Sequence, residues 1–187
     1  MSDVSVLNIP NSISLLRICL VPLVVWLIIT NQIQGAFTVF VLAGLSDAVD
    51  GFIAKRFGMK TELGAYLDPL ADKLLLVSIY IALGLLGELP SWLVILIVSR
   101  DILIIAGFLL SWILDHPFAI DPAFISKINT AIQIVLAAVV LGDMGFDLAL
   151  NGFRTVLIFT TGTLTLLSAS TYLLAWLRHM SEYENGG

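Results

Sequence analysis

The stretch "SDAVDGFIAKRFGMKTELGAYLDPLADK" (residues 46–73) gathers four aspartates, three glycines and four lysines or arginines in a chain that is otherwise strongly apolar. Of the 187 residues, 59% are hydrophobic and only 12% are charged, and the mean hydropathy is +1.02. This balance is much more apolar than that of a soluble domain. We therefore expect an integral membrane protein, in which so many charges in one stretch require a physical reason.

Apolar runs recur along the chain on both sides of this stretch. A helix needs roughly 20 residues to cross the hydrocarbon core of a bilayer, and helices satisfy their backbone groups internally, as lipid demands. We predict an all-α integral membrane protein, a single domain over residues 1–187, with six transmembrane helices at residues 12–31, 34–56, 66–86, 89–112, 124–142 and 153–177.

The N-terminal segment "MSDVSVLNIPNS" lacks a basic region, so we expect the first span to be retained rather than cleaved as a signal peptide. Residues 4–9 form either a short interfacial helix or a frayed terminus. Asn11 follows a proline and reads as a helix N-cap. Cys19 is the only cysteine, which excludes a disulfide within one chain. The net charge of −5 says little, because the acidic residues cluster, and the sequence has no nucleic-acid footprint, so we expect no nucleic-acid partner.

The lysines and arginines predict the orientation in the membrane, because cytoplasmic loops carry an excess of these residues. One side of the six-span topology collects Arg17, Lys55, Arg56, Lys60, Lys73, Lys127 and Arg178. The other side holds Arg154, and Arg100 lies near the middle of the fourth span. We expect both termini and the 57–65 loop to face the cytoplasm, in a bacterial inner (plasma) membrane.

The four aspartates flank this short loop. Asp47 and Asp50 are three residues apart on one predicted helix, and Asp68 and Asp72 are four apart on the next, so each pair shares a helix face. A charge at the centre of a membrane helix costs roughly 2.5 to 3.5 kcal/mol on the insertion scale. Divalent cations would offset that cost and the mutual repulsion, and Mg²⁺ favours a few carboxylates together with phosphate oxygens. The hypothesis is a two-metal phosphate site, with Asp72 as a candidate base.

Small and basic residues surround the acidic pairs. Gly51, Ala54 and Gly64 would let a ligand approach the backbone, or would serve close helix packing, as small residues often do in membranes. The cations Lys55, Arg56 and Lys60 could hold further phosphate groups, although the charge bias of cytoplasmic loops also accounts for them.

The pattern D-x-x-D-G-x-x-A over residues 47–54, followed by G-x-x-x-D-x-x-x-D over residues 64–72, resembles the signature of the CDP-alcohol phosphatidyltransferases. It departs from that signature after the alanine, where the family usually has arginine and this chain has Lys55 and then Arg56. Lysine lacks the bidentate fork of arginine, so the residue that contacts a phosphate stays open between the two.

The resemblance implies transfer of a phosphatidyl group from CDP-diacylglycerol to an alcohol, with release of CMP and use of two divalent ions, Mg²⁺ or Mn²⁺. It implies metal ligands at Asp47, Asp50, Asp68 and Asp72, a general base at Asp72, and contacts to the CDP moiety at Gly51, Ala54 and Gly64. Residues 98–105 and 122–133 are similar to segments of the CMP-forming, eukaryotic-type cardiolipin synthases, which implies phosphatidylglycerol as the acceptor. The alternative is a phosphatidylglycerophosphate synthase, with glycerol 3-phosphate as the acceptor.

An acceptor that carries its own phosphate requires a cation. Arg100 and Lys127 are candidates, but Arg100 could instead form a structural pair with Asp101, and Lys127 could mark the end of a span. Arg17 could approach a nucleotide or lipid phosphate, and Asn11 could contact the nucleotide or serve only as a cap.

Two other classes of membrane protein fit the sequence less well. A membrane prenyltransferase also uses acidic metal sites, but its two motifs lie far apart, whereas here all four aspartates fall within 26 residues. A cation transporter would place acidic residues or broken helices in both halves of a repeat, and the last three spans hold only Asp101. Gly162, in a Thr- and Ser-rich final span, favours close helix contacts, either in a homodimer or against the fifth span.

Overall fold

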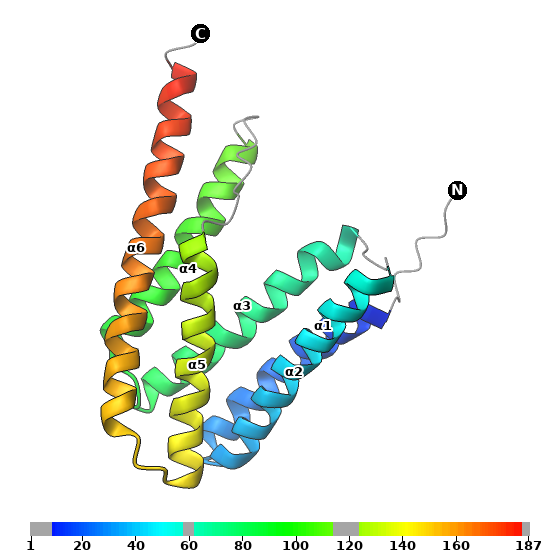
Figure 1. Cartoon of the computed structure of the whole chain (residues 1–187), viewed down its shortest axis with the longest axis vertical. Helices are drawn as coiled ribbons and strands as arrows, with labels where there is room; N and C mark the ends of the chain where they lie inside the picture. The colour runs from blue at the N-terminus through cyan, green and yellow to red at the C-terminus, as the bar shows by residue number, and fades with distance from the viewer. Residues whose placement is uncertain (1–8, 58–61, 114–123, 185–187) are drawn as a thin grey trace. The chain divides into compact units, whose positions relative to one another are not determined.

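The computed structural model describes residues 9–57, 62–113 and 124–184 (Figure 1). The regular structure of these residues is helical, and they contain no strand. The helices are α1 (Ile9–Ile29), α2 (Ile33–Phe57), α3 (Glu62–Leu85), α4 (Ser91–Ile113), α5 (Phe124–Phe146) and α6 (Asn151–Glu184). The prediction of an all-helical chain is confirmed.

The helix boundaries differ from the predicted spans at several ends. α3 begins at Glu62 rather than at residue 66, and α1 begins at Ile9 rather than at residue 12. Pro10 and Asn11 therefore lie in the first turn of α1, where proline is tolerated because its missing N–H has no helical partner. The reading of Asn11 as the N-cap is wrong. Residues 4–8 of the predicted interfacial segment lie outside the described residues.

Two of the helices are long and apolar enough to cross a membrane, by length and composition, within the part of the chain that the structure describes. They are α5 and residues Asn151–Leu177 of α6. Shorter apolar stretches are Leu15–Ile29 of α1 and Ile33–Asp47 of α2. The topology with six spans stays a prediction.

The helices group into two compact units. The first unit comprises Met1–Glu88 and Ala137–Leu150, and the second comprises Leu89–Leu136 and Asn151–Gly187. The first unit contains α1, α2, α3 and the end of α5, and the second contains α4, the start of α5 and α6. The single-domain prediction is not tested by this division.

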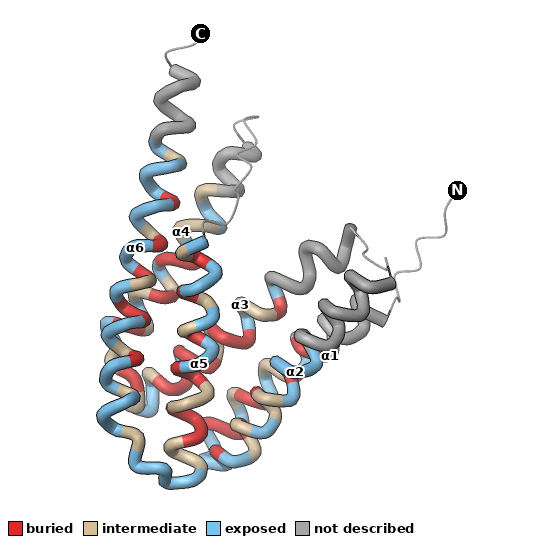
Figure 2. The backbone as a smooth tube through the Cα atoms, viewed as in Figure 1, coloured by how far each residue is buried: buried red, intermediate tan, exposed pale blue. Residues whose placement is uncertain are grey.

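In the first unit, α1 packs against both α2 and α3. The buried side chains of each helix recur at intervals of three and four residues, so they form one face of the helix; Figure 2 marks buried positions in red. The buried side chains include Val24, Leu27 and Ile28 of α1, Ala36, Phe40 and Ala43 of α2, and Leu75, Leu76, Ile79, Tyr80 and Leu83 of α3. This face is what brings the predicted site residues of the three helices together.

Two helices of this unit end in the same hydrogen-bonded cap. After α1, Asn31 has a φ of 60°, and the N–H of Gln32 donates to the carbonyl of Leu27 at 2.8 Å. After α3, Gly87 has a φ of 77°, and the N–H of Glu88 donates to the carbonyl of Leu83 at 2.9 Å. Both are Schellman caps, which need a left-handed residue such as glycine or asparagine. These residues end the two helices sharply.

In the second unit, α4 packs against α6. Gly162 is buried at this contact, and a Cβ on it would lie 2.8 Å from Cζ3 of Trp92. The ring of Trp92 also packs on Phe159, with 6.1 Å between the ring centroids. Gly162, which was predicted to favour a close helix contact, therefore contacts α4 of the same chain. The homodimer stays a prediction.

Candidate functional site

One arginine joins the two acidic helices of the first unit. Nη2 of Arg17 in α1 donates to Oδ1 of Asp47 in α2 at 2.6 Å, and Nη1 donates to Oδ1 of Asp72 in α3. The side chain of Arg17 is 3% exposed, whereas each carboxylate is 41% exposed. A buried cation thus holds two more accessible carboxylates from two different helices.

Helical periodicity puts all three side chains on the packed faces of their helices. Asp47 continues the buried series of α2, four residues after Ala43 and seven after Phe40. Residues at such spacings lie on one side of a helix. In the same way, Arg17 lies seven residues before Val24, and Asp72 lies four before Leu76. The convergence therefore follows from the same pattern that builds the core.

The other two predicted metal ligands lie on the same helices, one turn away. Asp50 is in α2, three residues after Asp47, and Asp68 is in α3, four residues before Asp72. Their side chains lie outside the described residues. Among the side chains that are described, no group of three or more histidines, cysteines, aspartates and glutamates is close enough to hold a metal.

The described pair nevertheless fits a divalent cation. Two carboxylate oxygens from separate helices both accept from one guanidinium, so they already converge on a positive charge. Carboxylate oxygens are the ligands that Mg²⁺ and Mn²⁺ prefer. In this structure the guanidinium of Arg17 supplies that positive charge.

The remaining predicted nucleotide contacts lie near the ends of α2 and α3. Gly51, Ala54, Lys55 and Arg56 fall in the last turns of α2, and Gly64 falls in the first turn of α3. Their side chains are outside the described residues, as is Lys60 altogether. The roles of all these residues stay predictions.

Arg100 lies in the second unit, at the centre of a buried polar network. Its Nη1 donates to Oδ1 of Asp101 at 2.6 Å, Nε and Nη2 donate to Oγ of Ser168 at 3.2 and 2.8 Å, and Nη2 also donates to Oγ of Ser126. Its guanidinium carbon lies 5.7 Å from the ring centroid of Tyr172. Arg100 is 3% exposed and Asp101 is 7% exposed. The structural pair left open by the sequence is therefore present, and it links α4, α5 and α6.

A second polar contact extends this network. Thr165 of α6 donates to the side-chain carbonyl of Asn129 in α5 at 3.0 Å, and both residues are fully buried. Lys127, in contrast, is exposed on α5. The sequence carries a signal for these contacts, because Thr165, Ser168 and Tyr172 recur at helical spacing in the Thr- and Ser-rich final span, but it does not identify their partners.

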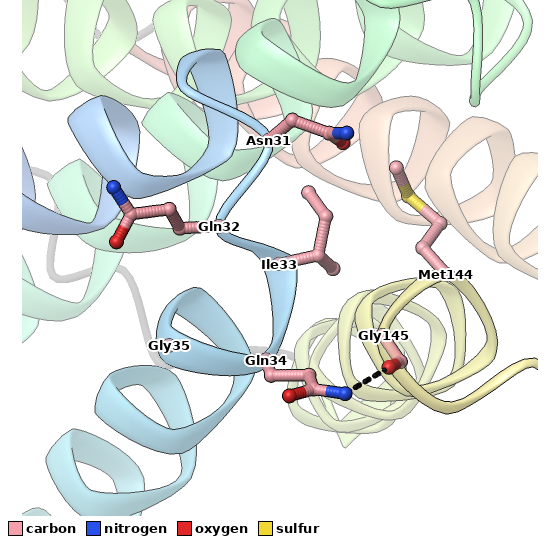
Figure 3. Close-up of a pocket in the computed structure, with 7 residues that line it drawn as sticks. All are labelled: Asn31, Gln32, Ile33, Gln34, Gly35, Met144 and Gly145. Carbon is pink, nitrogen blue, oxygen red and sulfur yellow. Dashed lines mark hydrogen bonds between the residues drawn. The ribbon is translucent and has the colours of Figure 1, made fainter.

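A pocket of about 430 Å³ lies at the start of α2 (Figure 3). It is lined by residues 31–35 and by Met144 and Gly145. Asn31, Ile33 and Met144 point into the same space, and Nε2 of Gln34 donates to the carbonyl of Gly145 at 2.9 Å (Figure 3). None of these lining residues is charged, so among the described residues this pocket offers no cation for a phosphate.

A family model for CDP-alcohol phosphatidyltransferases matches residues 7–177. The chain belongs to the CDP-alcohol phosphatidyltransferase family. The match covers all four aspartates and every other predicted site residue, and it confirms the resemblance carried by residues 47–72.

Relatives within the family carry two different names. The chain is 37% identical over 181 residues to "Cardiolipin synthase (CMP-forming)" of Rattus norvegicus, and equally identical to the Homo sapiens protein of that name, covering 88% of this chain and 60% of each relative. It is 35% identical over 185 residues to the chloroplastic "CDP-diacylglycerol--glycerol-3-phosphate 3-phosphatidyltransferase 1" of Oryza sativa, covering 89% of this chain and 56% of the relative. The chain therefore spans a little over half the length of these relatives.

Proposed function

We propose that this protein transfers a phosphatidyl group from CDP-diacylglycerol to the glycerol headgroup hydroxyl of phosphatidylglycerol, giving cardiolipin and CMP with the help of two divalent ions. The observation that carries the proposal is the convergence of Asp47 and Asp72, from α2 and α3, on one cation. These two residues begin and end the acidic signature of the family.

The chemistry is a displacement at phosphorus. The acceptor hydroxyl oxygen bonds to the phosphorus of the phosphatidyl group, the bond from that phosphorus to the CMP oxygen breaks, and Asp72 takes the hydroxyl proton. Asp47, Asp50, Asp68 and Asp72 would hold Mg²⁺ or Mn²⁺. When bound, these ions would neutralise charge on the attacking and leaving oxygens. Gly51, Ala54 and Gly64 would leave room for the CDP moiety.

The acceptor has two candidates, because the relatives carry both names. Cardiolipin synthase is the first choice, since two of the relatives at 37% identity bear that name. Phosphatidylglycerophosphate synthase, which uses glycerol 3-phosphate, is the second, favoured by the rice relative at 35% identity. In either case Arg100, Lys127, Lys60 and Arg17 are the proposed cations for lipid or acceptor phosphate, with Lys55, Arg56 and Asn11 near the nucleotide.

We place the protein in a bacterial inner membrane, with six spans and with both termini and the acidic site in the cytoplasm. Within the described ranges, two helices have the length and composition to span a bilayer. Large apolar side chains on other helices are also exposed, such as Leu42 at 57%, Ile95 at 65% and Ile102 at 60%, as a lipid-facing surface requires. We further propose a homodimer, which the molar mass of the protein in detergent, corrected for bound detergent, would test.

The proposed activity is tested with purified protein and CDP-diacylglycerol, using release of CMP as the readout. Phosphatidylglycerol and glycerol 3-phosphate are supplied separately, each with Mn²⁺ or with EDTA. We expect CMP release with phosphatidylglycerol and metal only. Preference for glycerol 3-phosphate would select the second candidate, and activity undiminished by EDTA would refute the metal mechanism.

The role of Asp72 is tested by Asp72→Asn in the same assay. We expect turnover to fall by about 10²- to 10⁴-fold, the usual contribution of a general base, with binding of CDP largely retained. Asp147→Asn is the matched control, since Asp147 is exposed and asparagine tolerates its φ of 54°. Turnover of Asp72→Asn equal to that of the control would remove Asp72 as the base.

A further inference from the structure

We propose that Arg17 is a built-in counter-ion that holds the metal ligands together when no metal is bound, and that a divalent cation displaces it from Asp47, Asp72 or both. This inference rests on the proposed metal site. It assigns to Arg17 a positioning role that precedes any contact with substrate.

The two carboxylates meet at one guanidinium. Oδ1 of Asp47 and Oδ1 of Asp72 each accept from a different Nη of Arg17, so the two oxygens are held next to the same positive charge. Two carboxylates held in this way repel each other unless a positive charge lies between them. The guanidinium therefore lies where a bridging divalent cation would bind.

A divalent ion and Arg17 compete for the same carboxylate oxygens. Hydrogen bonds between a guanidinium and a carboxylate direct the oxygen lone pairs at the N–H groups. A divalent ion needs those lone pairs at coordination distance, and its two positive charges attract the carboxylates more strongly than one delocalised charge. Metal binding at Asp47 or Asp72 is therefore expected to break a contact with Arg17 rather than add to it.

Arg17 has hydrogen-bond donors left for another ligand once a metal displaces it. Nε of Arg17 is buried and has no hydrogen-bond partner among the described residues. A guanidinium has five N–H donors, so the bridge leaves donors unused. Once Nη2 is released from Asp47, Nη2 and Nε form an edge suited to two oxygens of one phosphate group. The ligand class for the displaced guanidinium is therefore a phosphate next to the metals.

The alternative is a permanent structural bridge, retained when metal binds. The two cases differ in how the arginine affects metal affinity. A displaced counter-ion competes with the metal, so its removal strengthens metal binding and weakens the metal-free protein. A permanent bridge positions the ligands in both states, so its removal weakens metal binding.

The experiment measures Mn²⁺ affinity by electron paramagnetic resonance and the melting temperature in EDTA, on the full chain in detergent. Arg17→Gln removes the charge, and Arg17→Lys keeps the charge but replaces the planar fork by a single ammonium group. Arg154→Gln is the control for loss of an arginine elsewhere. For Arg17→Gln we expect a lower melting temperature in EDTA and Mn²⁺ binding about tenfold tighter than in the wild type, as loss of a charge-assisted hydrogen bond implies.

Arg17→Lys distinguishes the loss of the guanidinium bridge between Asp47 and Asp72 from the loss of a positive charge alone. We expect this variant to shift in the same directions as Arg17→Gln, because one ammonium group does not reproduce the fork. If Arg17→Gln does not fold, Arg17→Lys decides alone. Mn²⁺ binding unchanged or weakened in the variants would overturn the inference while leaving the proposed function intact. A wild-type protein that binds no Mn²⁺ would refute the proposed metal site, and the inference with it.

Discussion

Replacing Arg100 by methionine removes the cation at the centre of the buried network of the second unit while keeping a long apolar side chain. The change leaves Asp101, which is 7% exposed, without the guanidinium that lies 2.6 Å from its Oδ1. It also leaves the hydroxyls of Ser168 and Ser126 without this donor, and the ring of Tyr172 without its cation. We expect Arg100→Met to destabilise the fold.

The magnitude follows from these contacts. Removing one partner of a buried ion pair costs about 3 to 5 kcal/mol, because a charge is left buried and uncompensated. Each hydrogen bond to a serine adds about 0.6 kcal/mol, the average measured within membranes. Relaxation around Asp101 offsets part of this sum, so we take the lower limit of the ion-pair cost, about 3 kcal/mol, as the total loss. A chain of this length then melts about 6 to 12 °C lower.

The assay is thermal unfolding in detergent, combined with the KM for phosphatidylglycerol. Lys127→Met is the comparison, because Lys127 is exposed and its loss is expected to change the free energy of unfolding by less than about 0.5 kcal/mol. The double variant Arg100→Met/Asp101→Asn should recover part of the stability, since the buried carboxylate that lost the guanidinium is also gone. An unchanged melting temperature together with a raised KM would refute the structural role of Arg100 and favour its predicted role at a lipid phosphate.

Two glycine substitutions test the packing and the helix ends. Gly162→Ala adds a Cβ 2.8 Å from the ring of Trp92 and should destabilise the protein by about 1 to 3 kcal/mol. Its control is Gly152→Ala, which should have little effect because no atom lies within 4 Å of the added Cβ. Gly87→Ala strains a residue at φ 77° and should cost about 1 kcal/mol, whereas Gly44→Ala, in open space within α2, should stabilise by about 0.5 to 1 kcal/mol. Equal melting temperatures within either pair would contradict the corresponding contact or cap.

The sequence predicted the helices well because each apolar run is long and has a repeating buried face. The largest differences lie at charged ends. α3 begins four residues before the predicted span, at Glu62, since a helix does not stop where its apolar pattern does. The predicted N-cap at Asn11 is wrong for a related reason, because the proline before it is compatible with the first turn of a helix.

The acidic site was only partly predictable. The sequence placed Asp47 and Asp72 on two consecutive helices with a short connection. The partner Arg17 lies 30 and 55 residues away from them in the sequence, and no local pattern links residues so distant. For Arg100, the adjacent Asp101 was visible, but the serines of α5 and α6 become partners only when the helices pack.

The contact of Arg17 with the two aspartates also bears on the order of events during synthesis. α1 leaves the ribosome before α2 and α3, so the arginine has already been made when the acidic helices emerge. Each carboxylate can therefore meet an opposite charge as its helix packs against α1, before any ion has been captured. The chain thus carries within its first helix the counter-charge for acidic residues of the next two.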